Sequence, residues 1–115
     1  MSMFSVNIKD HEEIKVISLN GVLDAHTAAD LENHLKTLIE GGSNRIVVNF
    51  KDLQYIASAG LGVFMAYIED VRDQHGDIKL CEMSDKVYNV FDLLGFPVLY
   101  DITRTESEAI VKFKG

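Results

Sequence analysis

The amino-acid sequence predicts an α/β fold with a mixed β-sheet of four to five strands flanked by about four helices. Short runs rich in β-branched residues alternate with segments whose apolar residues recur every three to four positions. Residues 45–50 are apolar almost throughout, as is typical of a strand covered on both faces. Because 115 residues can bury one sizeable core but not two, residues 1–115 are predicted to form a single domain.

The first elements are predicted to be two strands and a helix. Residues 4–8 alternate apolar and polar side chains, and residues 14–19 follow an acidic turn, which indicates a hairpin. Asn20 and Gly21 are expected to end the second strand. A helix is then predicted by apolar residues that recur at helical spacing until Gly41 and Gly42, namely Ala28, Leu31, Leu35, Leu38 and Ile39.

The strand at 45–50 should lie centrally in the sheet. After a short loop, a second helix is predicted by five apolar residues with a period near 3.6 that continue to Val71: Leu61, Phe64, Met65, Ile68 and Val71. Asp52 is expected to cap or solvate the loop that follows the central strand. Ser58 falls where this loop meets the helix.

The remaining segments continue the alternation. A strand is expected at 78–83 and a third helix at 87–94, which Gly95 ends. A short strand is expected at 98–100, beyond Pro97. Acidic residues in a first turn and apolar residues at helical spacing predict a last helix within 105–113.

Composition limits the classes of partner. The net charge of −7 argues against nucleic acid, because phosphate binding needs clustered Lys and Arg. Cys81 is the only cysteine, so neither an internal disulfide nor a cysteine zinc cluster can form, and a reducing cytoplasm is the expected setting. Residues 56–68, the most apolar stretch, are too short and too glycine-broken to span a bilayer, so we expect a soluble protein without membrane contact.

Ser58 is the strongest candidate for a functional residue. A serine at the start of a helix can cap it with its hydroxyl, and on residue type alone that role, worth about 1 kcal/mol, is the simpler one. A phosphate added to the same hydroxyl would lie on free backbone N–H groups at the positive end of the helix dipole. The site can therefore exist in two charge states.

Gly60 and Gly62 fall in the first turns of the same predicted helix. Each costs about 1 kcal/mol of helix propensity relative to Ala, so their presence suggests that a backbone or a partner approaches closely. Tight packing of the helix on the sheet explains the two glycines equally well.

Catalytic readings of this region are weaker. A nucleotide-binding turn would need a third glycine or a Gly-Lys-Ser/Thr sequence. A hydrolase elbow would need Gly-x-Ser-x-Gly around Ser58, and only the second of its two glycines, Gly60, is in place. Ser58 could be grouped with Asp24 and His26, but Asp and His two residues apart before a helix more often serve as turn and cap groups. We therefore expect a protein that is not an enzyme.

The histidines also lack the spacing of a metal site. None of the four forms an i, i+4 pair or has a cysteine partner: His11, His26, His34 and His75. No metal and no other cofactor is expected.

Two stretches carry a family resemblance: residues 21–24, Gly-Val-Leu-Asp, and residues 52–62, which include Ala-Ser-Ala-Gly-Leu-Gly. On these the chain resembles the STAS family, and within it the bacterial anti-sigma-factor antagonists, which carry a regulatory phosphoserine before an Ala-Gly-Leu-Gly or Ser-Gly-Leu-Gly run. The resemblance extends from the strand at Phe4 through the last helix. Many antagonists have Asp immediately before the phosphoserine, where this chain has Ala57.

The resemblance implies a partner switch. The unphosphorylated protein would bind an anti-sigma factor that is also a serine kinase, which frees a sigma factor, and phosphorylation of Ser58 would end that binding. A serine phosphatase is a further candidate partner, and the oligomeric state is left open. The resemblance places Asp24 near the phosphorylation site, although a turn aspartate is an equally good reading. The partner-binding residues are expected to be Asp24, Ser58, Ala59, Gly60, Leu61 and Gly62.

Two alternatives belong to other functional classes. A STAS module can serve as a scaffold or regulatory subunit of a larger sensory or transport complex, and a receiver-like phosphoacceptor shares the element order. The receiver reading fails on residues, because no acidic pair follows the first strand and no Asp closes the strand at 45–50. A kinase-type anti-sigma partner that modifies Ser58 with ATP would distinguish the switch from the scaffold.

Overall fold

The computed structural model describes residues 4–114, which form one five-stranded sheet in the order β1-β2-β3-β4-β5. β1 pairs antiparallel with β2 and the other neighbours are parallel, so the predicted mixed sheet is confirmed. The strands are β1 (Phe4–His11), β2 (Ile14–Leu23), β3 (Arg45–Ile56), β4 (Asp77–Cys81) and β5 (Ile102–Thr103).

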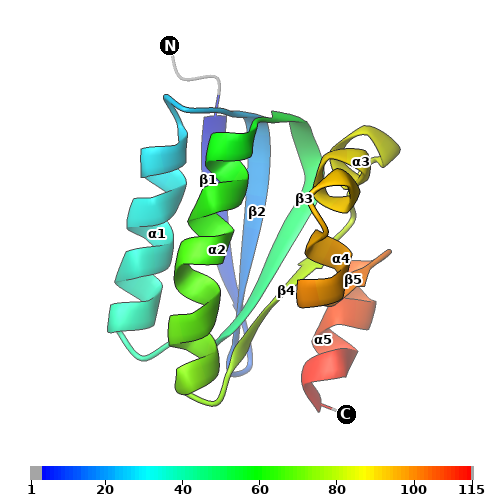
Figure 1. Ribbon diagram of the computed structural model, residues 1–115. Coiled ribbons are helices and arrows are strands. Elements are labelled where there is room, and N and C mark those ends of the chain that lie inside the picture. The colour runs from blue at the N-terminus through cyan, green and yellow to red at the C-terminus, as the bar shows by residue number, and fades with distance from the viewer. Residues whose placement is uncertain (1–3, 115) are drawn as a thin grey trace.

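Five helices within the described residues connect or follow the strands: α1 (Ala28–Glu40), α2 (Ser58–Asp73), α3 (Asp85–Leu93), α4 (Phe96–Leu99) and α5 (Glu106–Lys114). In Figure 1, α1 and α2 lie side by side over the sheet, and α3 and α4 lie toward the side of the sheet that holds β4 and β5. Apolar residues of all four join the main core, whereas α5 packs on the other face through Ala109, beside Val47 and Cys81. The fold therefore has helices on both faces of the sheet.

β3 occupies the centre of the sheet, as the sequence predicts. Val48 and Phe50 face the main core, while Val47, directly before Val48, faces the smaller cluster beneath α5. All three side chains are fully buried, which explains why this strand is apolar at successive positions instead of alternating.

Both β2 and β3 run further than the sequence pattern predicts. Asn20 and Gly21, expected to end the second strand, lie inside β2, where the register shifts and Gly21 has φ of 97°. A positive φ suits glycine, so this residue accommodates a bulge without ending the strand. β3 likewise continues to Ile56 and contains Asp52, so the loop expected after Phe50 is absent from the described chain.

The strand expected at 98–100 is also wrong, because this segment belongs to the short helix α4 and the turn after it. Gly95, with φ of 78°, provides a left-handed turn after α3, and Pro97 in the first turn of α4 has the fixed φ that a helix start needs. These backbone constraints outweigh the strand preference of Val98 and Tyr100. The edge strand β5 forms at Ile102–Thr103 instead.

Tyr100 offers a test of how α4 is packed. Its ring is buried and stacks on Phe96 at a centroid separation of 5.5 Å, and its hydroxyl has no hydrogen-bond partner among the described residues. Burial also raises the pKa of this phenol, so the hydroxyl stays protonated. Tyr100→Phe should leave the free energy of unfolding unchanged or raise it by about 1 kcal/mol, since an unsatisfied buried hydroxyl is costly. Urea unfolding measures this, and a loss above about 1 kcal/mol would show that the hydroxyl has a stabilising partner.

Candidate functional site

Ser58 is the first residue of α2, and it is exposed to solvent. The residue in the N-cap position is Ala57, whose backbone is extended, with φ of −105° and ψ of 164°. Residue type alone allows Ser58 to cap the helix, but no side chain among the described residues caps α2. Because the Ser58 hydroxyl does not hold the helix start, chemical modification of this hydroxyl would remove no cap.

The parallel pairing of β2 and β3 brings Asp24 and Ser58 together at one edge of the sheet, the edge where the carboxyl ends of these two strands lie. Leu23 and Ile56, the last residues of the two strands, are register partners, and the Ala57 N–H donates to the Leu23 carbonyl at 2.9 Å. Asp24 follows Leu23 directly, and Ser58 follows Ala57. α1 and α2 also both begin at this edge (Figure 1).

A compact turn fixes the Asp24 carboxylate. Its Oδ1 accepts hydrogen bonds from the backbone N–H groups of His26 at 2.9 Å and Thr27 at 3.1 Å. The Thr27 hydroxyl accepts from the Asp24 N–H at 2.9 Å and donates to the Val22 carbonyl at 2.9 Å. Desolvation acts to raise the pKa of Asp24, but the hydrogen bonds from Thr27 and His26 outweigh it and lower the pKa below its usual 3.8. Asp24 is therefore an anion at neutral pH.

Thr27 is a site residue that the sequence reasoning missed. Its hydroxyl ties the end of β2 to the start of α1 through Val22 and Asp24. An Asp followed three residues later by Thr, just before an apolar helix pattern, is a local hydrogen-bonding signature that could have indicated this turn.

The first turns of α2 have an inner and an outer side. A Cβ placed on Gly60 would lie 2.6 Å from the Leu23 Cγ, and Leu61 is buried in the main core. Ser58, Ala59 and Gly62 are exposed, and a Cβ on Gly62 would meet no described heavy atom within 4 Å. Gly60 and Leu61 therefore lie on the buried side of α2, against the sheet. Ser58, Ala59 and Gly62 form the exposed surface of the site.

The charge pattern around Ser58 differs from that of the other long helices. Among the helices described, α1, α3 and α5 carry acidic residues in their first turns, whereas α2 carries none there. Since the first N–H groups of a helix lack intrahelical partners and carry partial positive charge, the start of α2 offers uncompensated donors. An anionic group attached to Ser58 would be well placed to use them.

The catalytic and metal alternatives gain no support from this geometry. The Asp24 carboxylate binds the backbone N–H of His26, whereas a triad needs a carboxylate on the imidazole. Across residues 4–114, no three His, Cys, Asp or Glu side chains gather as a metal site. Within the same residues, no helix combines the length and apolar character needed to cross a membrane.

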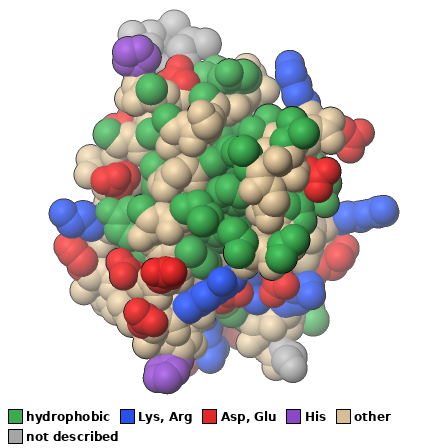
Figure 2. Space-filling view, in the orientation of Figure 1, with side chains coloured by type: hydrophobic (Ala, Val, Ile, Leu, Met, Phe, Trp, Pro, Cys, Tyr) green, Lys and Arg blue, Asp and Glu red, His purple; other side chains and the backbone are tan. Residues whose placement is uncertain are grey.

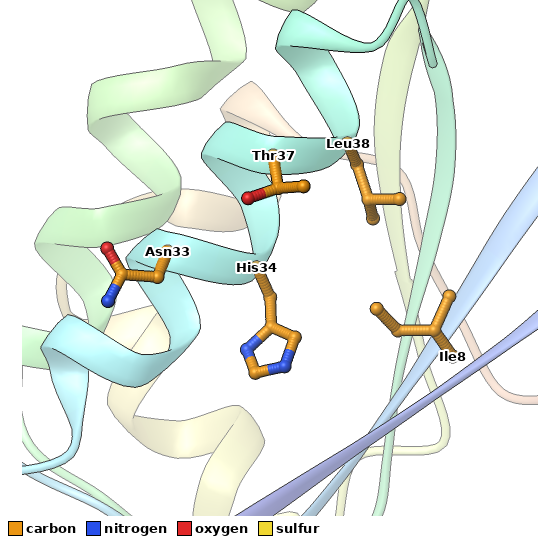
Figure 3. A pocket seen from close by; sticks show the side chains of 5 residues that line it. All are labelled: Ile8, Asn33, His34, Thr37 and Leu38. Carbon is orange, nitrogen blue, oxygen red and sulfur yellow. The ribbon is translucent and has the colours of Figure 1, made fainter.

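A separate groove of about 210 Å³ lies between β1 and α1 (Figure 3). Its lining consists of Ile8, Asn33, His34, Thr37 and Leu38. The ring Nδ1 of His34 lies 2.7 Å from the Asp30 carbonyl oxygen, so this ring is fixed within α1. None of the predicted site residues lines the groove, which is therefore distinct from the edge that holds Asp24 and Ser58.

Comparison with known proteins supports one family. The STAS domain profile matches residues 5–109. An anti-sigma factor antagonist named BtrV, from Bordetella bronchiseptica, is 31% identical over 99 residues, which cover 86% of this chain and 85% of that protein. The anti-sigma-B factor antagonist of Bacillus subtilis is also 31% identical over 99 residues, covering 86% of this chain and 90% of the relative.

Solved structures agree with the fold. The unphosphorylated form of the anti-sigma factor antagonist SpoIIAA superposes with a TM-score of 0.84 at 27% identity, covering 96% of this chain and 97% of SpoIIAA. The phosphorylated form of Bacillus SpoIIAA gives a TM-score of 0.74 at 26% identity, covering 95% of this chain and 99% of that one. Family profile, sequence relatives and fold agree, and the chain belongs to the STAS domain family.

Proposed function

We propose that this protein is an anti-sigma factor antagonist that works as a partner switch. In its unphosphorylated form it binds an anti-sigma factor that is also a serine kinase, and this releases a sigma factor. Phosphorylation of Ser58 ends the binding. The observation that carries the proposal is the exposed Ser58 hydroxyl at the start of α2, beside the open surface of Ala59 and Gly62.

The names of the relatives support the type of partner. BtrV and the Bacillus subtilis protein are both named as antagonists of anti-sigma factors, and SpoIIAA has been solved with and without its phosphate. These names describe binding proteins and not catalysts. A phosphorylation-controlled binding function therefore fits the family to which the chain belongs.

Electrostatics explains how one phosphate could act. A phosphoserine carries about −1.5 to −2 charge at neutral pH. Solvent and the free N–H groups of α2 accommodate this charge in the isolated protein, but burial against a partner would remove the solvent. The chain already has a net charge of −7, and Asp24 adds a carboxylate at the same edge. Binding is thus lost without refolding.

Ala57, which replaces the usual Asp of the family, does not alter this placement. The contact that fixes residue 57 is the backbone hydrogen bond from its N–H to the Leu23 carbonyl, at 2.9 Å. This bond is independent of the side chain, so Ser58 keeps its position at the edge.

The proposal is tested by capture from extracts of the source cells, with Ser58→Ala and Ser58→Glu proteins as baits. Mass spectrometry should identify a kinase-type anti-sigma factor on the Ser58→Ala bait and little of it on the Ser58→Glu bait. The captured protein, once purified, should transfer phosphate from ATP to Ser58 of the wild-type chain. Capture without any such factor, or modification at another residue, would reject the switch in favour of a scaffold role.

Asp24→Asn tests the role of the acid at the site. The amide oxygen can still accept the bonds from His26 and Thr27, so the turn should persist while the charge is lost. We expect the rate of Ser58 phosphorylation by the anti-sigma kinase to fall about tenfold, because the negative charge beside Ser58 that would help to position the kinase and its ATP is lost. The assay is incorporation of labelled phosphate, with Asp52→Asn, an exposed acid of β3, as the matched control. An unchanged rate would leave Asp24 as a turn residue.

A further inference from the structure

The turn that joins α3 to α4 exposes an unusual amount of apolar surface. The α3–α4 patch consists of Leu93, Leu94, Val98 and Leu99, which are 85%, 54%, 89% and 42% exposed. Single exposed apolar residues are ordinary, but four large ones within seven positions form a patch of the kind that marks interaction sites.

Buried contacts hold the α3–α4 patch against α2. Phe91 of α3 lies 6.3 Å from Phe64 of α2 and 5.2 Å from Phe96 of α4, measured between ring centroids. The Arg72 guanidinium of α2 donates to the Leu99 carbonyl. The patch is therefore supported by aromatic packing beneath it and has a fixed position beside α2.

The outer side of α2 connects the α3–α4 patch to Ser58. From residue 58 to residue 68, α2 contains no charged residue, and its exposed positions after Ser58 are Ala59, Gly62, Met65 and Ala66. Figure 2 shows hydrophobic side chains gathered across this face of the molecule, over α2 and the neighbouring helices. The first charged residue of α2 along the chain is Glu69. An uncharged surface thus extends from Ser58 to the patch.

We propose that the α3–α4 patch is the apolar anchor for the anti-sigma factor, a role that rests on the proposed function. The partner that meets Ser58 also covers the side of α2 and reaches the patch. A stable interface buries about 800 Å² on each partner and concentrates its affinity in a few large anchors. Ser58, Ala59 and Gly62 are too small to supply such anchors, whereas the patch lies on the same continuous face.

Charge favours the anti-sigma factor over a second copy of this chain. Glu69 on α2 and Asp92 on α3 are exposed acids next to the uncharged surface, and the whole chain has a net charge of −7. Two copies, each with this net charge, would repel one another, which opposes association. The matching surface of the partner is an apolar pocket with basic residues at its rim.

Val98→Asp tests the anchor, because Val98 is almost fully exposed and its replacement should leave the fold intact. Titration calorimetry with the purified anti-sigma factor from the capture experiment should show at least a tenfold loss of affinity. Val98→Ile should bind like wild type. The matched control is Val111→Asp. Val111 is 63% exposed but lies on α5, the helix that covers the other face of the sheet. The affinity of this variant for the anti-sigma factor should stay within twofold of wild type. Equal melting temperatures verify folding.

Three results would contradict the inference or its basis, and they are distinguishable. Unchanged affinity in both Val98→Asp and Leu94→Asp, with binding still lost in Ser58→Glu, would reject the anchor and leave the switch standing. Equal binding of Ser58→Glu and wild type would reject the switch itself. A wild-type dimer in sedimentation that Val98→Asp dissociates, with partner affinity unaltered, would assign the patch to a second copy.

Discussion

Ser58→Glu is expected to lower the affinity for the anti-sigma factor about a hundredfold, which corresponds to about 2.7 kcal/mol. The substitution adds a permanent negative charge at the edge that already holds the Asp24 carboxylate, and the partner would have to bury it. Ser58→Ala should bind as wild type does, and it should keep its affinity after incubation with ATP, whereas we expect wild type to lose affinity. Calorimetry against the purified anti-sigma factor, before and after incubation with ATP, measures both effects.

The structure supplies a matched control for this charge. Ser107 is an exposed serine in the first turn of α5, so Ser107→Glu adds the same group to a helix start far along the chain from Ser58. Its affinity should remain near that of wild type. If Ser107→Glu weakens binding as much as Ser58→Glu does, net charge and not the position of Ser58 controls the interaction.

Gly62→Leu and Gly60→Leu are expected to separate binding from folding. A Cβ at residue 62 meets no described atom within 4 Å, so Gly62→Leu should keep or raise stability, by up to about 0.8 kcal/mol of helix propensity. It should nevertheless lower partner affinity at least tenfold, about 1.4 kcal/mol, since the larger side chain holds a docked surface away.

Gly60→Leu should show the opposite pattern. Its Cβ would lie 2.6 Å from the Cγ of the fully buried Leu23, and this overpacking should cost about 1–3 kcal/mol of stability. A thermal melt beside a binding titration measures both variants. A marked fall in melting temperature for Gly62→Leu, with affinity retained by the folded fraction, would move Gly62 from the interface to the core.

The sequence predicts the long elements well because each has a repeated pattern. The helical spacing of Leu31, Leu35 and Ile39 and the continuous apolar run of β3 both correspond to buried faces. Strand ends are predicted less well. From the local sequence alone, Gly21 is expected to end the second strand. Its left-handed φ instead fits a bulge that pairing with β1 and β3 keeps inside the sheet.

The sequence predicts two parts of the surface less well, namely the connection before Ser58 and the α3–α4 patch. The sequence predicts Ser58 at the helix start, but it does not predict that Ala57 alone connects β3 to α2. That connection depends on where the parallel pairing of β2 and β3 ends, which is at Leu23 and Ile56. Leu94 fits the apolar period of α3 and would be expected in the core, yet it is exposed because α3 ends at Leu93. The exposed α3–α4 patch therefore became visible only in three dimensions.

The uncapped start of α2 has a consequence for how long the protein persists in a cell. Because Ser58 supports no cap in the described structure, adding or removing a phosphate on it would leave the internal contacts of the fold in place. A phosphate there would also gain the free N–H groups of α2, so the phosphorylated form should open no more often, and be cleaved by proteases no faster, than the unphosphorylated form, since proteolysis follows the population of opened molecules. The active fraction of the protein could then change without extra degradation, and the response could reverse without new synthesis.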